Sequence, residues 1–238
     1  MSENQIPDHT AEADALKPNP NVRCTGWQFI ELPIDPSKVR LNILRETEVN
    51  LFLQRNNIKK TRLGTVGLAV TGGVFFNDLS DPDGSLALAN EGSSLDSCLG
   101  HSARGGKYHY HANINCTQAG AATGANDPDQ CVLIGYYNDG VPVYGLCRDS
   151  DGMMFTSCYK LSSSASLTTI ETVSGTYDVA ATNTDYSFSA DSNCNLDEAS
   201  GALHPGTGQY SYFMTTDYPW TPIKWAGDQG TGSLCSAA

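Results

Sequence analysis

The stretch "VLIGYYNDGVPVYGL", residues 132–146, carries the clearest structural signal in this sequence. Two runs rich in β-branched and aromatic residues flank a short polar segment formed by Asn138, Asp139 and Gly140. These residue types accept the positive-φ backbone angles that a tight turn between antiparallel strands requires. The stretch therefore predicts a β-hairpin, and it sets the expectation that the chain is built from strands.

Segments that precede this hairpin show the same preference for strands. "KVRLNIL" (38–44) and "TEVNLFL" (47–53) alternate apolar with polar residues, as half-buried strands do, and we expect them to pair as a hairpin. "TVGLAVTGGVFF" (65–76) is more continuously apolar. It predicts a buried strand, or a hairpin bent at Gly72 and Gly73.

The rest of the chain lacks long helical periodicity, and residues 161–190 are rich in Ser, Thr and β-branched residues, which favour strands and turns over helix. We therefore predict an all-β or β-dominated fold, a single compact β-sandwich or barrel-like domain with long loops. Residues 1–22 are polar and interrupted by prolines, so an extended N-terminal arm is expected there. The β-rich domain is expected to span residues 23–238.

Charge and hydropathy restrict the partners of this chain. Its 26 acidic and 14 basic residues give a formal net charge of −12, and no run of Lys and Arg forms a basic stripe. Nucleic acids and anionic membranes would be repelled by such a surface. The sequence also lacks an apolar stretch approaching the roughly 18 residues of a membrane span. We expect neither nucleic acid as a partner nor a membrane-spanning segment.

Eight cysteines are spread along the chain, and no two of them form a C-x-x-C pair. Zinc ribbons and thioredoxin-like redox sites need that close spacing, so the count favours four disulfides and a secreted or periplasmic protein. The first ten residues lack the basic and apolar regions of a signal peptide, so we expect that such a signal has been removed. A reduced intracellular protein is the alternative. Short loops suggest two of the pairs, Cys98 with Cys116 and Cys147 with Cys158.

Two segments of the sequence resemble each other. "LDSCLGHSARGGKYHYH" begins at Leu95, and "LDEASGALHPGTGQYSYF" begins at Leu196, so residues 95–113 and 196–215 form a degenerate internal repeat. The tyrosines match, whereas Ser211 and Phe213 stand where the first copy has histidines. The tyrosines therefore indicate shared architecture, and the histidines indicate a function of the first copy.

The histidines of the first copy have the spacing of metal ligands. His109 and His111 are two residues apart, so on a strand their side chains project from the same face. The flexible "SARGG" segment allows His101 to fold back towards them. Three imidazoles are a typical ligand set for zinc and also suit copper. The alternative is that two half-exposed histidines on a strand pack without any metal.

Several segments together carry a resemblance to a known family. They are "QIPDH", "LDSCLGHSARGGKYHYH", "YYNDGVPVYG", "NLDEASG" and "YSYFMTTDYPW", which occur in this order. The chain resembles the YHYH-domain proteins from about residue 4 to about residue 227. This resemblance implies an exported, cysteine-containing domain, and it implies no particular activity.

The same resemblance marks individual residues. It marks His101, His109 and His111, the hairpin around Asp139, and the early His9, which becomes a fourth candidate ligand on the N-terminal arm. In the second copy the sequence departs from the family pattern, because "EASG" and "YSYF" replace the expected segments. A second histidine site is therefore not expected, and we assign His204 to a turn with a structural or surface role.

These observations favour an exported protein that binds one copper or zinc ion through His101, His109 and His111, with His9 as a further ligand. An open coordination position would allow metalloenzyme activity. The alternative is a non-metal adhesive, matrix or carbohydrate-interacting domain stapled by disulfides. The aromatic segment "YPWTPIKW" (218–225) bears on that alternative, because it could stack on sugars or simply pack on the β-rich body.

Overall fold

The computed structural model describes residues 58–70, 73–103, 106–112, 127–172 and 175–227, and the backbone of 29–30 and 232–233. The predicted N-terminal arm and the strands expected at 38–44 and 47–53 lie outside the described residues. The predicted β-dominated fold is confirmed, because the described residues contain sixteen strands and one five-residue α-helix. None of the described helices could cross a membrane.

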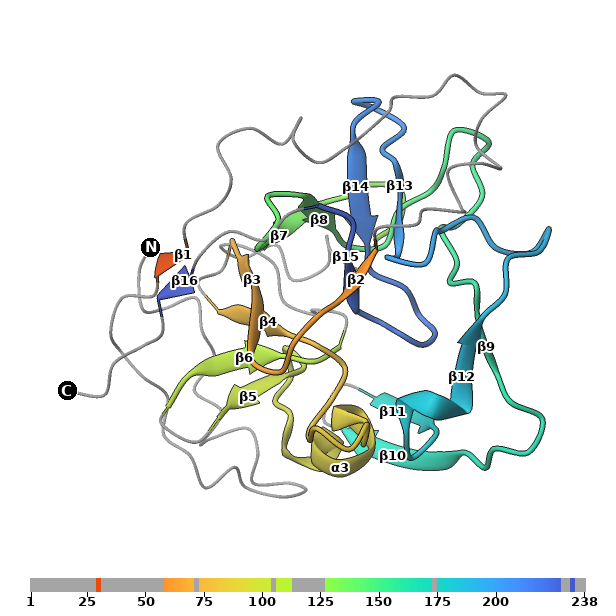
Figure 1. Cartoon of the computed structure of the whole chain (residues 1–238). Helices are drawn as coiled ribbons and strands as arrows, with labels where there is room; N and C mark the ends of the chain where they lie inside the picture. The colour runs from red at the N-terminus through yellow and green to blue at the C-terminus, as the bar shows by residue number, and fades with distance from the viewer. Residues whose placement is uncertain are drawn as a thin grey trace.

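The body of the protein is a mixed sheet of eight strands (Figure 1). Their order across the sheet is β13-β14-β8-β7-β3-β4-β6-β5. The strands are β3 (Thr65–Ala69), β4 (Val74–Phe76), β5 (Gly100–Ser102), β6 (Tyr108–Tyr110), β7 (Leu133–Tyr137), β8 (Pro142–Tyr144), β13 (Gly201–Leu203) and β14 (Tyr210–Phe213).

Four pairs of strands and three helical segments complete the described elements. The two-stranded sheets are β1 (Phe29–Ile30) with β16 (Gly232–Ser233), β2 (Lys59–Lys60) with β15 (Lys224–Trp225), β9 (Tyr159–Leu161) with β12 (Tyr186–Phe188), and β10 (Thr168–Thr172) with β11 (Gly175–Val179). The helical segments are α3 (Ala87–Glu91) and the 3₁₀ turns η5 (Gly92–Ser94) and η7 (Asn183–Asp185).

The hairpin expected at residues 132–146 is present as β7 and β8. Gly140 has a positive φ of 80°, and the Asp139 carboxylate accepts the Val141 N–H at 3.3 Å, which closes the turn. The apolar run at 65–76 forms a second hairpin, β3 and β4, with antiparallel pairing. The expected bend at Gly72 lies outside the described residues.

The two halves of the eight-stranded sheet have the same connectivity. In the first half, hairpin β3–β4 is followed by hairpin β5–β6, and β6 pairs in parallel with β4. In the second half, hairpin β7–β8 is followed by hairpin β13–β14, and β14 pairs in parallel with β8. Strands β3 and β7 join the halves, with Leu68 opposite Tyr136 at the centre of their pairing.

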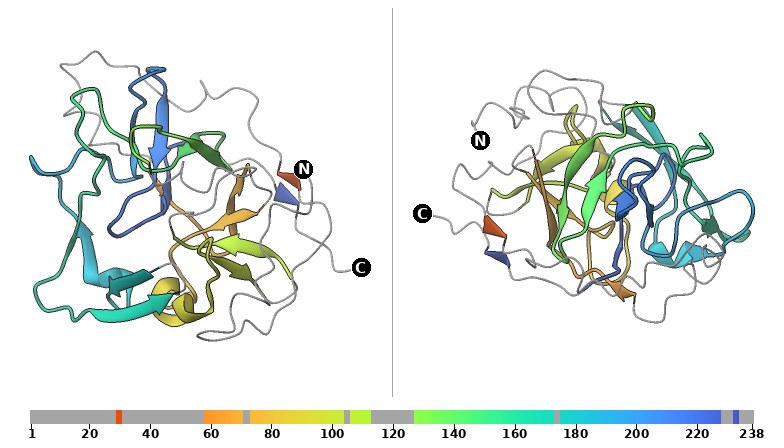
Figure 2. Two further views of the ribbon diagram at one scale, coloured as in Figure 1. Left: turned by 180° about the vertical axis from the view of Figure 1, so that it is seen from behind. Right: turned by 90° about the horizontal axis from the view of Figure 1, so that it is seen from above.

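Each half carries its own insertion between its two hairpins. The first insertion holds α3 and η5, and the second holds β9 to β12 with η7. The second insertion lies on the side of the molecule remote from β1 and β16 (Figures 1 and 2). The two insertions therefore give otherwise similar halves different surroundings.

The outer hairpins of both halves are fastened by the same pair of side chains. The Tyr108 hydroxyl donates to Asp96 at 2.6 Å, and the Tyr210 hydroxyl donates to Asp197 at 2.8 Å. All four residues are buried. The tyrosines that match between the two sequence segments are thus core residues in equivalent positions.

Two disulfides are formed among the described residues, Cys131–Cys147 and Cys158–Cys194. The expected pair Cys147–Cys158 is therefore wrong, because the β7–β8 hairpin brings Cys131 and Cys147 together across its open end. Cys98 is also disulfide-bonded. Its expected partner Cys116 lies outside the described residues.

Candidate metal centre

The hairpin β5–β6 brings the three histidines of the first copy together. His101 on β5 pairs directly opposite His109 on β6, and His111 follows two residues later on the same face as His109. The Nε2 atom of His109 lies 3.0 Å from Nε2 of His101 and 2.8 Å from Nε2 of His111. All three rings are buried. The alternate tyrosines, Tyr108 and Tyr110, point into the core instead.

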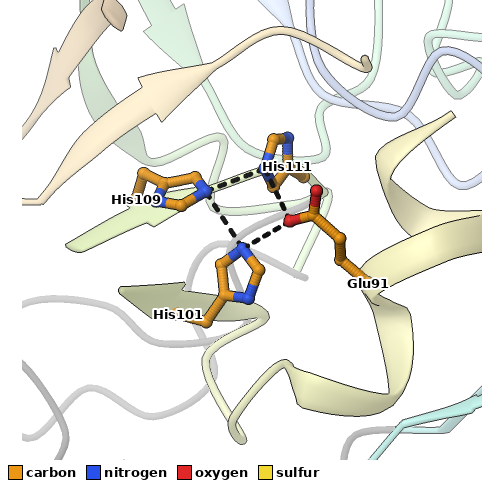
Figure 3. Close-up of side chains that lie close together, drawn as sticks. All are labelled: Glu91, His101, His109 and His111. Carbon is orange, nitrogen blue, oxygen red and sulfur yellow. Dashed lines mark hydrogen bonds and ion pairs between the residues drawn. The ribbon is translucent and has the colours of Figure 1, made fainter. Parts of the chain in front are cut away.

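A carboxylate completes the cluster. Glu91 is the last residue of α3, and its Oε2 atom lies 3.0 Å from Nε2 of His101 and 3.7 Å from Nε2 of His111. The four side chains point towards one centre (Figure 3), and their nearest N and O atoms all lie within 4.8 Å of one another. The helix and the hairpin thus form one compact group of metal-ligand atoms.

The protonation of two rings follows from what their outer nitrogens face. Nδ1 of His109 lies 3.1 Å from the Lys107 carbonyl oxygen, and Nδ1 of His111 lies 2.7 Å from the Asn77 carbonyl oxygen. A carbonyl oxygen only accepts hydrogen bonds, so both Nδ1 atoms carry the proton. In a neutral ring the other nitrogen is then a bare lone pair. The Nε2 atoms of both rings therefore face each other as acceptors.

The same argument applies to His101 through a serine. Nδ1 of His101 lies 2.9 Å from the Ser94 hydroxyl, and that hydroxyl donates its proton to the Glu91 carbonyl oxygen at 2.7 Å. Because the serine proton is used, its oxygen accepts from His101 Nδ1–H. The other ring nitrogen of His101, Nε2, faces the Glu91 carboxylate at 3.0 Å.

Burial keeps His109 and His111 neutral. Desolvation, with a further contribution from His111 and His101, lowers the pKa of His109 well below its ordinary value. Desolvation and the neighbouring His101 lower the pKa of His111 to about 4, although Glu91 acts in the opposite direction. At neutral pH these rings are therefore not imidazolium donors. The lone pairs of these two rings and the Glu91 carboxylate therefore lie close together, and a cation placed between them would stabilise this arrangement.

The spacing of the four atoms fits first-row metal ions. Ligands at 2.0–2.1 Å from a tetrahedral zinc ion are separated by about 3.3 Å, and adjacent ligands in a square-planar copper site by about 2.9 Å. Four of the six pairs among the ligand atoms of Glu91, His101, His109 and His111 are 2.8 to 3.7 Å apart, and the other two lie within 4.8 Å, which is compatible with either metal after small shifts of the side chains. The donor set of three imidazoles and a carboxylate suits either metal.

The walls of the cluster limit access from solvent. The Phe76 ring stacks on His109 with centroids 3.9 Å apart and meets His111 edge-on at 5.7 Å. The Lys107 ammonium lies over the outer part of Phe76, 5.9 Å from its centroid. Among the four cluster side chains, Glu91 is 32% exposed, whereas His101 and His111 are 6% and 3% exposed. The cluster is therefore most accessible to solvent on the side of Glu91.

Three of the five histidines in the sequence lie in the cluster. His101, His109 and His111 meet, as their spacing predicts, and their binding of a metal stays a prediction. His9 lies outside the described residues. His204 is half-buried just before a turn, where its ring accepts the Gly206 N–H at 3.0 Å and packs against Tyr144 with centroids 4.3 Å apart, in agreement with the structural role expected for it.

Sequence reasoning missed Glu91. It lies ten residues before His101 on a helix of five residues, and no motif connects the two positions. The acidic residue just before "GSS" was the available signal. It becomes informative only once α3 and η5 are known to turn the chain back onto β5.

The equivalent position in the second half has no ligand set. Ala202 pairs with Ser211 where His101 pairs with His109, and Phe213 replaces His111. Phe213 packs on Phe155 with centroids 4.1 Å apart, next to the buried Cys147. An apolar cluster thus fills this position, in line with the expectation that only the first copy carries a histidine site.

Comparison with known proteins gives a family and no individual relative. No curated protein and no solved structure matches this chain. The model of the family described as "YHYH protein" matches residues 52–227, which include the histidine cluster, Glu91 and both hairpins of each half. The chain therefore belongs to the YHYH protein family.

Proposed function

We propose that this protein is an exported metal-binding protein that holds one copper or zinc ion through Glu91, His101, His109 and His111. The observation that carries the proposal is the convergence of four metal-ligand atoms, three imidazole Nε2 atoms and one carboxylate oxygen, all within 4.8 Å of one another. The surroundings of the three Nδ1 atoms also support metal binding. Metal-binding histidines commonly donate their second N–H to a carbonyl or hydroxyl, as these three do.

Four protein ligands favour binding, delivery or a structural role over hydrolysis. Catalytic zinc sites keep one position open for water, whereas closed sites have four protein ligands. Glu91 takes the fourth position, for which His9 was the candidate. Ligation by His9 stays a prediction. Displacement of the partly exposed Glu91 would be the step that opens the site to a water molecule.

Export is supported by the cysteines. Two disulfides are formed, Cys98 is disulfide-bonded as well, and no described cysteine is free. Structural disulfides persist in oxidising compartments and are rare in the cytosol. A secreted or periplasmic location follows from this chemistry.

The proposal is tested by elemental analysis of protein purified without an affinity tag and dialysed against micromolar copper or zinc. We expect one metal ion per chain in the wild type and none in the His101→Ala/His109→Ala/His111→Ala variant. His204→Ala removes a histidine outside the cluster and should retain the full amount. Equal metal content in the wild type and the triple variant would favour the competing hypothesis, in which the rings simply pack.

The ligand set is tested by spectroscopy on the loaded protein. Electron paramagnetic resonance of the copper form should show hyperfine coupling to imidazole nitrogens, and X-ray absorption of the zinc form should show nitrogen and oxygen neighbours at about 2.0–2.1 Å. A copper spectrum without nitrogen coupling would contradict the three-histidine site. Circular dichroism of each variant shows whether a loss of metal is due to a loss of fold.

A further inference from the structure

The second insertion forms a cleft that the metal centre does not use. It lies between β9, β11, β12 and the segment 215–220, and its volume is about 700 Å³. This volume falls within the range of about 300–1,000 Å³ that small-molecule sites occupy. None of the four cluster residues lines it. The cleft is therefore a separate candidate for ligand binding.

Aromatic rings held in fixed orientations line the cleft. Tyr186 stacks flat on Tyr218, with centroids 3.9 Å apart and planes 13° apart, and Tyr218 in turn meets Tyr159 and Trp220 edge-on. The Tyr218 hydroxyl donates to the buried Asp78 at 2.6 Å, and the Tyr159 hydroxyl donates to a backbone carbonyl at 2.9 Å. Because these hydroxyls are used inside the protein, the rings offer a ligand their apolar edges and faces.

Polar groups are placed around these rings. The cleft is also lined by Lys160, Asp178, Asp217, Thr215 and Thr216. Asp217 is exposed, and its carboxylate accepts one hydrogen bond from Thr216, at 3.3 Å. Rigid aromatic surface bordered by carboxylates, hydroxyls and an ammonium group suits a ligand with both apolar faces and many hydroxyls.

Charge narrows the ligand class further. The cleft is lined by two carboxylates, Asp178 and Asp217, and by one ammonium group, that of Lys160. Lys160 is already paired with Asp191 at 3.3 Å, so an anionic ligand would be repelled. A purely apolar ligand would remove water from these charged groups and would offer them no hydrogen bonds in place of those lost to water. A neutral, polyhydroxylated ligand satisfies both conditions.

We propose that this cleft is a binding site for neutral oligosaccharides, whose sugar rings stack on the Tyr186 side and whose hydroxyls bond to Asp217 and its polar neighbours. The segment 218–225 then contributes to both packing and recognition, because Tyr218 and Trp220 are almost fully buried yet line the cleft. The proposal is independent of the metal centre.

The test is titration calorimetry with neutral tetrasaccharides of glucose, mannose, galactose and N-acetylglucosamine. We expect saturable binding of at least one of them by the wild type. Tyr186→Ala and Asp217→Ala should each weaken that binding at least about fivefold, since an aromatic contact or a hydrogen bond contributes about 1 kcal/mol. Tyr136→Ala removes a 38% exposed tyrosine outside the cleft and should leave binding unchanged.

Three outcomes would overturn the proposal. The first is the absence of saturable binding for every tetrasaccharide up to about 10 mM, which is weaker than specific recognition requires. The second is unchanged binding in Asp217→Ala, an exposed variant expected to keep its fold, even if Tyr186→Ala is unstable. The third is loss of binding in a folded His101→Ala/His109→Ala/His111→Ala variant, because the site would then depend on the histidine cluster.

Discussion

Glu91 differs from the three histidines of the cluster in where it sits and in how it meets solvent. The histidines lie on or next to paired strands, whereas Glu91 ends the short helix α3 and is partly exposed. A carboxylate adds the negative charge that partly neutralises a divalent ion and that three neutral imidazoles cannot supply. Glu91 should therefore affect affinity strongly while contributing little to the fold.

Replacing Glu91 by Gln keeps the size of the side chain and removes its charge. We expect the affinity for zinc or copper to fall at least about tenfold, because even outer residues of metal sites contribute 10- to 100-fold. Competition with a chelator of known affinity measures the change. Glu171→Gln, which alters an exposed glutamate on β10, is the matched control. Equal affinities in the two variants would remove Glu91 from the ligand set.

Ser94 is the residue that orients His101. Ser94→Ala removes the acceptor for His101 Nδ1–H and leaves the ring free to adopt the other tautomer, so metal affinity should fall about 10- to 100-fold. The exposed Ser162→Ala is the control, measured by the same chelator competition. An unchanged affinity in Ser94→Ala would show that the serine hydroxyl does not fix the tautomer.

The three histidines could be found from the sequence, and Glu91 could not, for a physical reason. The spacing of His109 and His111 fixes their common face through the period of a strand, and a glycine-containing turn allows His101 to pair opposite His109. Those are local rules. The position of Glu91 depends on how α3 packs against β10, which is a tertiary contact between segments about 80 residues apart in the sequence.

At the scale of elements, the β7–β8 turn is joined to β14 by a buried carboxylate. Asp139 accepts a short hydrogen bond of 2.5 Å from the Tyr212 hydroxyl and a further bond from the Gly227 N–H at 3.1 Å. Burial outweighs these hydrogen bonds and raises the pKa of Asp139 from 3.8 to about 6. The turn therefore connects to the C-terminal segment through a group that titrates in a mildly acidic range.

This pKa predicts a pH-dependent stability. The folded state binds the Asp139 proton more tightly than the unfolded state, so its contribution is fully present below about pH 4 and is lost as pH rises through about 6. Asp139→Asn cannot ionise. Between about pH 4 and pH 8, the free energy of unfolding of the wild type should therefore fall by about 3 kcal/mol relative to that of Asp139→Asn.

Denaturant unfolding at both pH values measures that difference. Asp151→Asn replaces an exposed aspartate in a turn and should show the same difference from the wild type at both pH values. If Asp139→Asn behaved like Asp151→Asn, burial would not govern the Asp139 carboxyl.

The elements that local chemistry specifies were predictable, and those that depend on pairing across the sheet were not. Asn138, Asp139 and Gly140 specify the β7–β8 turn themselves, and the Ser- and Thr-rich segment 161–190 forms strands and turns as expected. The parallel pairings of β4 with β6 and of β8 with β14 leave no local signal, because each joins strands from different hairpins.

At the scale of the whole molecule, two similar halves carry different candidate sites. Each half consists of two hairpins with the same order and pairing, and the insertion of each half supplies what is specific to it. The first insertion supplies Glu91 to the histidine cluster, and the second supplies the walls of the aromatic cleft. The degenerate internal repeat in the sequence (95–113 and 196–215) stays a prediction, and the two halves that contain its copies have the same connectivity.

The separation of the halves predicts independent responses. Cys131→Ala/Cys147→Ala opens a disulfide with a sequence separation of 16, which should lower the free energy of unfolding by about 3 kcal/mol. The disulfide lies in the apolar cluster with Phe155 and Phe213, so metal content should not change. Denaturant unfolding and elemental analysis of the same sample measure both quantities. Metal loss accompanying disulfide loss would contradict this independence.

The ends of the eight-stranded sheet have a consequence for solubility. Its outermost strands, β5 and β13, are each three residues long. Exposed strand edges are templates on which other chains can add by hydrogen bonding, and short edges give such additions few partners. The two ends of this sheet therefore provide few hydrogen-bonding positions for aggregation, even when many copies are concentrated together.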